Sequence, residues 1–342
     1  MKVSRLMVVL LAWIMVASSG LGWAEEMEKP NMAVEMKVAA KNPEVWMCVH
    51  HPFDLVAPGG DWDFVRENLS GFKMYIGDLW KAPEETLKVF VGMLKENGIK
   101  FAIECGGVNI PSTLRVMDRI HAAGGKVDFL DMDHPMRRTM EQGQKKGVTV
   151  SPEEAADKLV AYMQGVRKKY PETGFWLLSN FPNWGYRGDV SYHARGANRQ
   201  DWGEYDDVLR AALKKTKEAG IPLEGLTVDN PYEYVTGIRE SNKLDDPSKI
   251  DWMKRLRTLE DFVRDAGLNF NLIIISEDGG KMSEHMFYER CMALVDIYNK
   301  AGGAPERLMV QSWYKHPVNT IPETAPHTMT NLVKDIILKT RQ

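Results

Sequence analysis

Cysteine and runs of basic residues are both scarce in this chain of 342 residues. Its three cysteines, Cys48, Cys105 and Cys291, are too few for a disulfide framework. Cys48 and Cys105 fall in or beside predicted strands, so we expect buried free thiols rather than a bridge. The formal net charge is −3, and no cluster of lysine and arginine stands out. These features make nucleic acid a poor candidate for a partner.

Long hydrophobic runs are absent beyond the start of the chain. The chain begins with basic residues, continues with an almost wholly apolar segment (6–16) and reaches small residues before Glu25. This order is typical of a secretory signal peptide, so we predict a signal peptide at 1–24 and a flexible lead-in at 25–41. The apolar segment is too short to span a bilayer comfortably. The mature protein is therefore expected to be secreted or periplasmic, with no attachment to a membrane.

A glycine-rich phosphate-binding turn is also missing. The first predicted strand ends in His50, His51 and Pro52, where open dinucleotide-binding sheets carry such a turn. What the chain does have is a regular alternation of eight strand-like and eight helical segments. Most of the helical segments end on glycine. This alternation implies parallel strands joined by right-handed crossovers. It predicts a single-domain (β/α)8 TIM barrel, of the α/β class, over residues 42–342.

The boundaries of these segments follow from apolar runs and from turn and capping residues. The expected strands are 45–49, 72–76, 100–104, 126–135, 175–178, 226–229, 270–275 and 308–311. The expected helices are 61–69, 83–96, 111–123, 151–169, 202–219, 250–266, 282–300 and 326–338.

The fourth strand segment carries Asp128, Asp131 and Asp133 within an apolar run. Because side chains alternate along a strand, Phe129, Asp131 and Asp133 share one face. Burying carboxyl groups is costly unless the strand ends in water or in a site. This segment therefore indicates a functional end of the sheet.

Polar and aromatic residues follow nearly every predicted strand. In a TIM barrel the loops after the strands form the C-terminal rim, where the active site lies. We therefore expect a site at this rim. The candidates, in strand order, are His50, His51, Asp78, Trp80, Glu104, Asp131, Asp133, His134, Asn180, Trp184, Asp229, Asn230, Tyr232, Glu233, Glu277, Asp278, Trp313 and Tyr314.

Acids that face one another across a rim, with aromatic side chains between them, suit the cleavage of glycosidic bonds. One carboxyl group protonates the leaving oxygen, and a second, ionised one attacks the anomeric carbon or activates water. In strand order and rim chemistry the chain resembles the (β/α)8-barrel glycoside hydrolase superfamily over the whole mature sequence. The resemblance implies a secreted enzyme that cleaves a poly- or oligosaccharide without a cofactor or a bound metal.

Individual motifs match known glycoside hydrolases in part. The acids of 126–135 resemble the start of the D-x-x-D-x-D-x-E strand of chitinases, with Pro135 in place of the final Glu. Glu277 lies where many retaining barrels have their strand-seven nucleophile, although the Asn-Glu pair after strand four is absent. Asp131 facing Asp229 is similar to the arrangement of α-galactosidase-like barrels.

The resemblance implies roles for particular residues. It makes Asp131 the nucleophile or base and Asp229 the acid, with Asp133, Glu277 and Glu104 as further catalytic candidates. The expected substrate-binding residues are His50, His51, Asp78, Trp80, His134, Asn180, Trp184, Asn230, Tyr232, Trp313 and Tyr314.

Each acid also has a purely structural interpretation. The acids of the fourth strand could pair with Arg137 or Arg138, and Glu104 could pair with a lysine or arginine of the barrel. Asp229 and Glu277 could stabilise turns.

Two other functions stay open. His50 or His51, with Asp131, Asp229 and Glu277, could hold a divalent ion in a metal-dependent hydrolase, lyase or isomerase. The His-x-His pair of amidohydrolases is absent, however. The third possibility is a non-catalytic carbohydrate-binding barrel. The sequence leaves the sugar, the linkage and the oligomeric state open.

Overall fold

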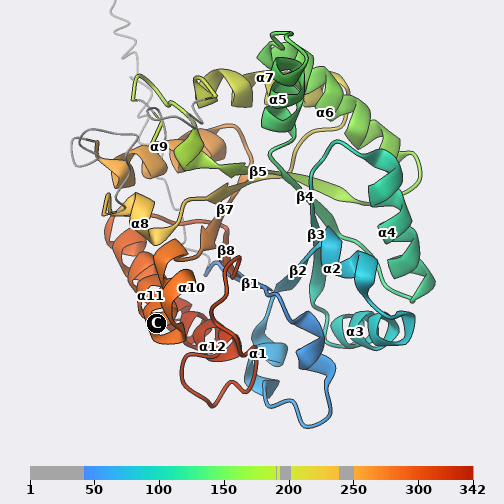
Figure 1. Ribbon diagram of the computed structural model, residues 1–342, viewed down its shortest axis with the longest axis vertical. Helices are drawn as coiled ribbons and strands as arrows, with labels where there is room; N and C mark the ends of the chain where they lie inside the picture. The colour runs from blue at the N-terminus through green and yellow to red at the C-terminus, as the bar shows by residue number, and fades with distance from the viewer. Residues whose placement is uncertain (1–41, 190, 193–201, 239–249, 342) are drawn as a thin grey trace, which may run out of the picture. The chain divides into compact units, whose positions relative to one another are not determined.

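The computed structural model describes residues 42–189, 191–192, 202–238 and 250–341. Within them, eight parallel strands close into a barrel in the order of the sequence, and β1 is hydrogen-bonded to β8 (Figure 1). The predicted TIM barrel is confirmed. The predicted signal peptide and lead-in lie outside the described residues. The strands are β1 (Glu44–Cys48), β2 (Gly71–Tyr75), β3 (Lys100–Cys105), β4 (Phe129–Asp133), β5 (Gly174–Asn180), β6 (Gly225–Asp229), β7 (Asn269–Ile274) and β8 (Arg307–Gln311).

Helices surround the barrel and return the chain from one strand to the next (Figure 1). Helix α6 (Pro152–Arg167) shows why these helices form. Its residues Ala155, Leu159 and Val166 recur at helical spacing and are buried in the hydrophobic core. Its start is fixed by a capping box between Ser151 and Glu154. The α-helices are α1 (Asp63–Asn68), α2 (Ile76–Lys81), α3 (Glu84–Glu96), α4 (Ile110–Ala122), α5 (Pro135–Lys145), α6 (Pro152–Arg167), α7 (Tyr205–Glu218), α8 (Tyr232–Val235), α9 (Trp252–Asp265), α10 (Glu277–Met282), α11 (Glu284–Lys300) and α12 (Met329–Thr340).

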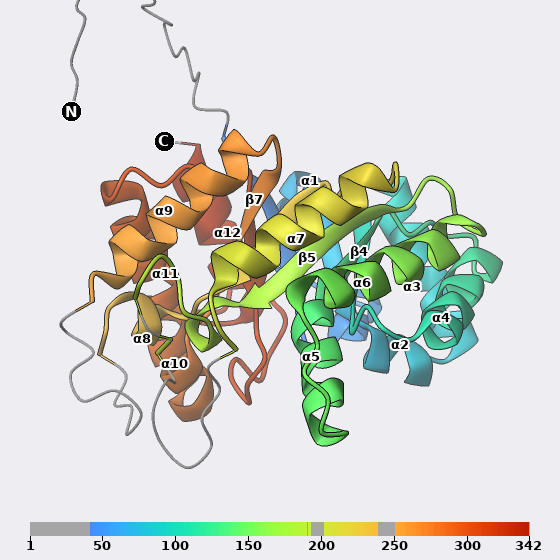
Figure 2. The same ribbon diagram turned by 90° about the horizontal axis from the view of Figure 1, so that it is seen from above.

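Four helices, α2, α5, α8 and α10, come soon after strand ends and lie on the same side of the barrel (Figure 2). A loop was expected after strand four, and this expectation is wrong. The helix expected at 282–300 corresponds to α11, whereas α2, α8 and α10 were not predicted. The fifth helix begins at Pro135, which has no N–H to leave unpaired in a first turn. Ser283 is extended and its hydroxyl caps α11, which separates α11 from α10.

Large side chains fill the barrel's interior toward the N-terminal ends of the strands, since Phe129 and Arg307 are the first residues of β4 and β8. The ring of Trp176 lies 5.1 Å from that of Trp46 and 4.2 Å from that of Phe129, measured between centroids. Gly71 leaves the space for Trp46, because a Cβ at this position would lie 2.3 Å from the indole ring. The guanidinium of Arg307 covers Trp176 at 5.0 Å. This aromatic layer blocks the barrel's axis below the polar residues of the rim.

All three cysteines are free and buried, which confirms the expectation for Cys48 and Cys105. Burial raises the pKa of Cys105 to about 11, so this thiol stays protonated near neutral pH. Of the helices in the described ranges, none has the combination of length and apolar character that a membrane span needs.

Candidate active site

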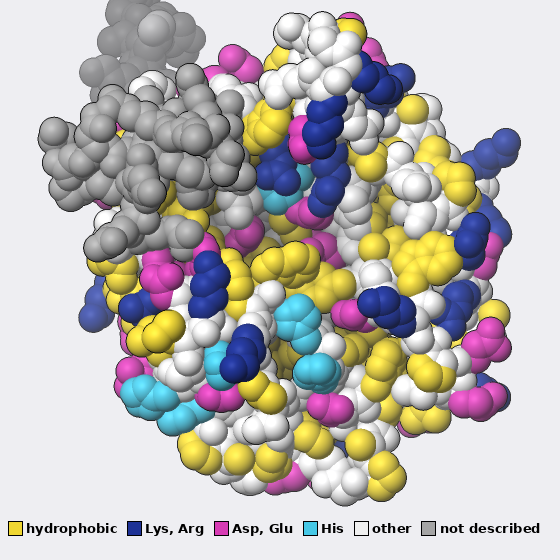
Figure 3. All heavy atoms as spheres, viewed as in Figure 1, with side chains coloured by type: hydrophobic (Ala, Val, Ile, Leu, Met, Phe, Trp, Pro, Cys, Tyr) yellow, Lys and Arg dark blue, Asp and Glu magenta, His cyan; other side chains and the backbone are white. Residues whose placement is uncertain are grey.

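A pocket of about 320 Å³ opens at the C-terminal rim. This volume is at the small end of the range for ligand cavities. Figure 3 looks onto this face: basic side chains gather beside α5, acidic ones lie next to them, and histidines lie near the centre. A larger hollow, about 500 Å³, lies between α3 and α4, away from the strand ends. The rim pocket is lined by Glu104, Asp133, His134, Arg137, Arg138, Leu178, Asn180, Asp229, Ile273, Ile275, Gln311, Trp313 and Tyr314.

Asp229, the last residue of β6, has an unusual environment in this pocket. Its Oδ2 accepts a hydrogen bond of 3.0 Å from Nδ2 of Asn180, at the end of the neighbouring β5. Its Oδ1 is buried and has no hydrogen-bond partner among the described residues. Burial raises the pKa of Asp229 to about 7; the hydrogen bond from Asn180 opposes the rise, and the charges of Glu104 and Asp133 reinforce it. Near neutral pH this carboxyl group is therefore present in both protonation states.

A buried lysine lies beneath the pocket. The Nζ of Lys73, on β2, is 2.7 Å from Oε2 of Glu104 and 2.8 Å from Oδ2 of Asp131. Burial alone lowers the pKa of Lys73, but the two carboxylates raise it overall, so the ammonium stays charged. Burial also raises the pKa of Glu104, against the effect of Lys73. Glu104 lines the pocket, whereas Asp131 has no exposed surface and belongs to the interior ion pair.

Asp133 and His134, at the end of β4, are held in one orientation. The Nε2 of His134 accepts the main-chain N–H of Asn180 at 2.7 Å, so Nδ1 carries the ring proton and donates it to Asp133. Arg138 donates to both the main-chain oxygen and the carboxylate of Asp133. Burial opposes ionisation, but the hydrogen bond from His134 and the charge of Arg138 lower the pKa of Asp133 well below its usual range. Asp133 is therefore ionised at neutral pH, in contrast to Asp229.

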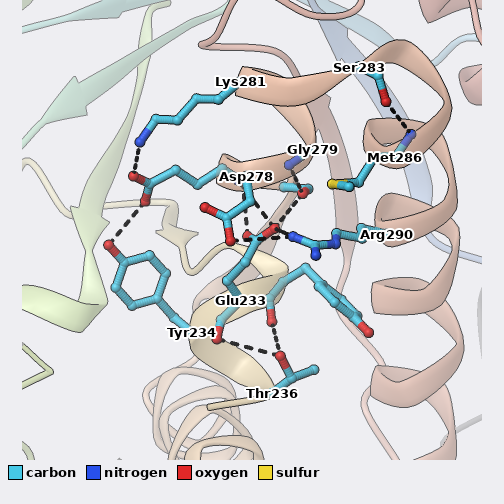
Figure 4. Close-up of polar contacts among 12 residues, drawn as sticks. Glu233, Tyr234, Thr236, Asp278, Gly279, Lys281, Ser283, Met286 and Arg290 are labelled. Carbon is cyan, nitrogen blue, oxygen red and sulfur yellow. Dashed lines mark hydrogen bonds and ion pairs between the residues drawn. The ribbon is translucent and has the colours of Figure 1, made fainter. Parts of the chain in front are cut away.

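Glu277, expected at the rim, contacts a separate polar cluster around the start of α10. Figure 4 labels its partners Glu233, Tyr234 and Lys281. The carboxylate of Glu277 accepts a hydrogen bond from the hydroxyl of Tyr234 at 3.0 Å and pairs with Lys281. The fully buried Glu233 accepts the main-chain N–H of Glu277 at 2.9 Å and pairs with Arg290 at 2.7 Å. This cluster fixes the turn between β7 and α10, and Glu277 does not line the pocket.

Comparison with known proteins identifies no family. No family model and no curated protein matches the chain. The truncated 3-deoxy-D-arabino-heptulosonate 7-phosphate synthase from Thermotoga maritima is 10% identical with a TM-score of 0.44, over 88% of this chain and 87% of that one. The aldolase QR15 is 10% identical with a TM-score of 0.41, over 81% and 92% of the two chains. The HpcH/HpaI aldolase from Desulfitobacterium hafniense is 10% identical with a TM-score of 0.39, over 81% and 90%. Likeness at this level extends to the barrel fold alone.

The expected resemblance to glycoside hydrolases is not supported. The geometry disagrees with it, because a nucleophile must reach its substrate, whereas Asp131 is fully buried with its Oδ2 bonded to Lys73. The prediction of a glycoside hydrolase that degrades polysaccharides with Asp131 and Asp229 as its carboxylate pair is therefore wrong.

The structure brings seven of the eighteen predicted rim residues together. Those that line the pocket are Glu104, Asp133, His134, Asn180, Asp229, Trp313 and Tyr314. Trp184 and Asn230 are buried instead, and the ring of His50 lies 6.3 Å from that of Trp313, outside the lining. The remaining predicted residues that do not line the pocket are His51, Asp78, Trp80, Asp131, Tyr232, Glu233, Glu277 and Asp278.

Sequence reasoning missed several polar residues of this region. Lys73 occupies the middle of an apolar strand, and a lysine at a buried strand position is itself a sign of an ion pair. Gln311 ends β8 and donates to Glu104 at 3.3 Å, but it was assigned only to the strand. Arg137 and Arg138 were considered only as partners of acids. The segment that carries them was expected to be a loop, so its position beside the pocket was not predicted.

The residues suggested for a metal ion are not gathered in one place. The described residues contain no group of three or more histidine, cysteine, aspartate or glutamate side chains that could hold such an ion. Of His50, His51, Asp131, Asp229 and Glu277, only Asp229 lines the pocket.

Proposed function

We propose that this protein is an enzyme of the lyase or isomerase type, which moves a proton on a small molecule bound at the C-terminal mouth of the barrel. One observation carries the proposal. Asp229 presents a buried carboxyl oxygen with no partner among the described residues, and its pKa is raised to about 7. A carboxyl group whose pKa lies near the working pH is an effective general acid or base.

The neighbouring residues support a division of roles. In its ionised form Asp229 would accept a proton from the substrate through Oδ1, while Asn180 holds Oδ2 in place. In its neutral form it would return the proton to another atom of the substrate or to a leaving fragment. Glu104 lies on the opposite part of the sheet, where its carboxylate pairs with Lys73. Asp133 stays ionised and orients His134.

Exchange of carbon-bound hydrogen with solvent tests the proposal. The protein is incubated in deuterium oxide with a panel of 2-oxo acids, hydroxyketones and aldehydes, and the loss of C–H signals is followed by proton NMR. We expect at least one class to exchange faster than in buffer. Asp229→Asn should lower that rate about 100-fold or more, since general acid–base groups contribute about 10²- to 10⁴-fold.

A matched variant controls for the loss of a carboxylate. Asp157 on α6 is exposed and pairs with Lys215 at the surface, so Asp157→Asn should exchange at the wild-type rate. Full exchange activity in Asp229→Asn, with an unchanged circular dichroism spectrum, would remove Asp229 from the mechanism. A panel in which no compound exchanges would remove the proposal itself.

A carbohydrate-binding barrel without catalysis is a second candidate, favoured by one observation. Trp313 directly follows β8, lines the pocket and is 55% exposed. A flat, exposed aromatic ring at the mouth of a pocket is a suitable surface for the apolar face of a sugar. Saturable binding of oligosaccharides, together with no solvent exchange on any panel compound, would favour this candidate over the first.

A further inference from the structure

Arg137 is a cation of the pocket that forms no ion pair within the described part of the chain, although Asp133 and Glu141 attract it from a greater distance. It lies in the first turn of α5, next to Arg138, and lines the cavity. Asp133 pairs with Arg138, but no described residue accepts a hydrogen bond from Arg137, and its Nε is buried and unpaired. A buried N–H without an acceptor is costly. An anion bound in the pocket would remove this cost.

We propose that the pocket binds a small organic acid and that Arg137 binds its carboxylate. The inference rests on the function proposed above, since it assigns a substrate class to the same pocket. A guanidinium group donates two parallel hydrogen bonds that match the two oxygens of a carboxylate. Figure 3 shows basic side chains gathered beside α5 on the face where the rim pocket opens.

The surroundings of Arg137 favour a carboxylate over a phosphate group. Three acids, Glu104, Asp133 and Asp229, line the same cavity, and their repulsion is greater for a dianion than for a monoanion. Phosphate sites at helix starts use main-chain N–H donors. Here Pro135 has no N–H, and the N–H of His134 donates to the main-chain oxygen of Leu178.

The rest of the lining suits a short carbon skeleton. Leu178, Ile273 and Ile275 supply apolar surface within the same cavity, whose volume is about 320 Å³. With its carboxylate at Arg137, a small acid would lie against this surface and within the space that Asp229 also lines. The cation would thus bind the substrate while the aspartate acts on it.

Binding of simple anions tests the assignment. Acetate, pyruvate and inorganic phosphate, with acetamide and pyruvamide as neutral analogues, are titrated at constant ionic strength and followed by saturation-transfer NMR. We expect the carboxylates to bind more tightly than phosphate or the amides. Arg137→Gln should raise the Kd of the carboxylates about 10- to 100-fold, the range for a hydrogen bond to a charged group. Arg137→Lys should give an intermediate value, since it keeps the charge and loses the paired donors.

A surface arginine serves as the control for charge. Arg210 on α7 is exposed and pairs with Asp206, so Arg210→Gln should bind the carboxylates as the wild type does. Equal binding by Arg137→Gln and the wild type would overturn the assignment of Arg137. Tighter binding of phosphate than of every carboxylate would overturn the ligand class, as would equal binding of the amides.

The two proposals can fail separately. If carboxylates bind through Arg137 but no compound exchanges hydrogen, the acid–base function fails and the anion site stands. If exchange depends on Asp229 but is as fast with uncharged ketones as with oxo acids, the acid–base function stands and the anion site fails. Asp229→Asn should keep carboxylate binding while it loses exchange, which both proposals require.

Discussion

Two aspartates at the same rim, Asp133 and Asp229, have opposite acidities because their neighbours differ. Asp133 accepts a hydrogen bond from His134 and pairs with Arg138, and both contacts lower its pKa. The carboxyl group of Asp229, whose Oδ1 is buried, has only an amide donor from Asn180, and its pKa rises to about 7. The charges and hydrogen bonds around each group thus decide which carboxyl can exchange a proton near neutral pH.

The raised pKa of Asp229 has a consequence for stability. An aspartate in the unfolded chain has a pKa of about 3.9, so between there and pH 7 the unfolded chain loses a proton that the folded protein keeps. The contribution of Asp229 to stability therefore falls as the pH rises from about 4 to about 7, and stays low above that. Asp229→Asn should raise the free energy of unfolding by about 1–3 kcal/mol at pH 8, with no gain at pH 4. Urea unfolding at both values measures this.

Asp133→Asn should change the free energy of unfolding in the opposite direction, and it serves as the control. Its pKa is depressed in the folded protein, so the ionised form contributes stability above the unfolded pKa and loses it as the pH falls through the folded pKa. This variant should lower stability at pH 8, and the loss should shrink towards acid pH. A loss of stability in Asp229→Asn at pH 8 would contradict the burial argument.

At the residue scale, the sequence located the acids but not their environments. Asp131 and Asp133 share one strand face, as predicted, yet one is an interior ion-pair partner and the other lines the pocket. A strand pattern gives the face of a residue but not its depth along the barrel. Asp131 is an interior residue because it pairs with Lys73. This lysine is 58 residues away in the chain and meets Asp131 only when the barrel closes.

At the scale of elements, the β7–α10 turn depends on one buried carboxylate. Glu233 accepts the hydroxyl of Ser276 and the main-chain N–H groups of Glu277 and Asp278, and it pairs with Arg290 (Figure 4). These N–H groups begin a helix and would otherwise have no acceptor within it. The short helix α8 thereby holds the start of α10, although neither helix is long enough to be stable alone.

Glu233→Ala tests this connection. The change leaves buried N–H groups and a guanidinium without their acceptor, so we expect a loss of about 2–4 kcal/mol in the free energy of unfolding. Amide hydrogen exchange at Glu277 and Asp278 should also accelerate more than at strand residues. Glu289→Ala is the control, since Glu289 is exposed and pairs only with His285, and it should change stability by less than about 0.5 kcal/mol. Equal exchange at the turn in both variants would refute the role of Glu233.

The helices that return the chain were predicted to within a few residues, because their apolar spacing and capping residues are local signals. The observed α3 (Glu84–Glu96) and α4 (Ile110–Ala122) differ from the expected bounds by one residue at each changed end. The segment 135–145 gave no such signal, because few of its residues are buried. Helices at the rim pack partly on the site rather than on the barrel, so the apolar pattern that reveals the others is weak there.

For the whole molecule, closure of the barrel depends on how large and small residues alternate in its interior. The absence of a side chain at Gly71 gives Trp46 its place, and Trp46 in turn packs on Phe129 and Trp176. The sequence predicted the barrel because strand and helix signals repeat regularly along the chain. It did not predict this packing, which joins strands from distant parts of the sequence.

Gly71→Ala tests the packing. Its new methyl group would overlap the indole of Trp46, so we expect a loss of about 1–3 kcal/mol in the free energy of unfolding. The loss should be smaller in a Trp46→Leu background, where the ring is absent. Gly92 on α3 has open space around its Cα, and Gly92→Ala should instead stabilise the protein by about 0.5–1 kcal/mol. Chemical denaturation of Gly71→Ala, Trp46→Leu, the double variant and Gly92→Ala measures these changes. A change in the free energy of unfolding of the same sign for Gly71→Ala and Gly92→Ala would contradict the packing argument.

The aromatic layer also determines how molecules can pass through the protein. Trp46, Phe129 and Trp176 obstruct the route along the axis, so a compound that enters the cavity must depart by the way it came. In the described part of the chain, uptake and release then share one opening, so a bound molecule keeps the next one out until it leaves.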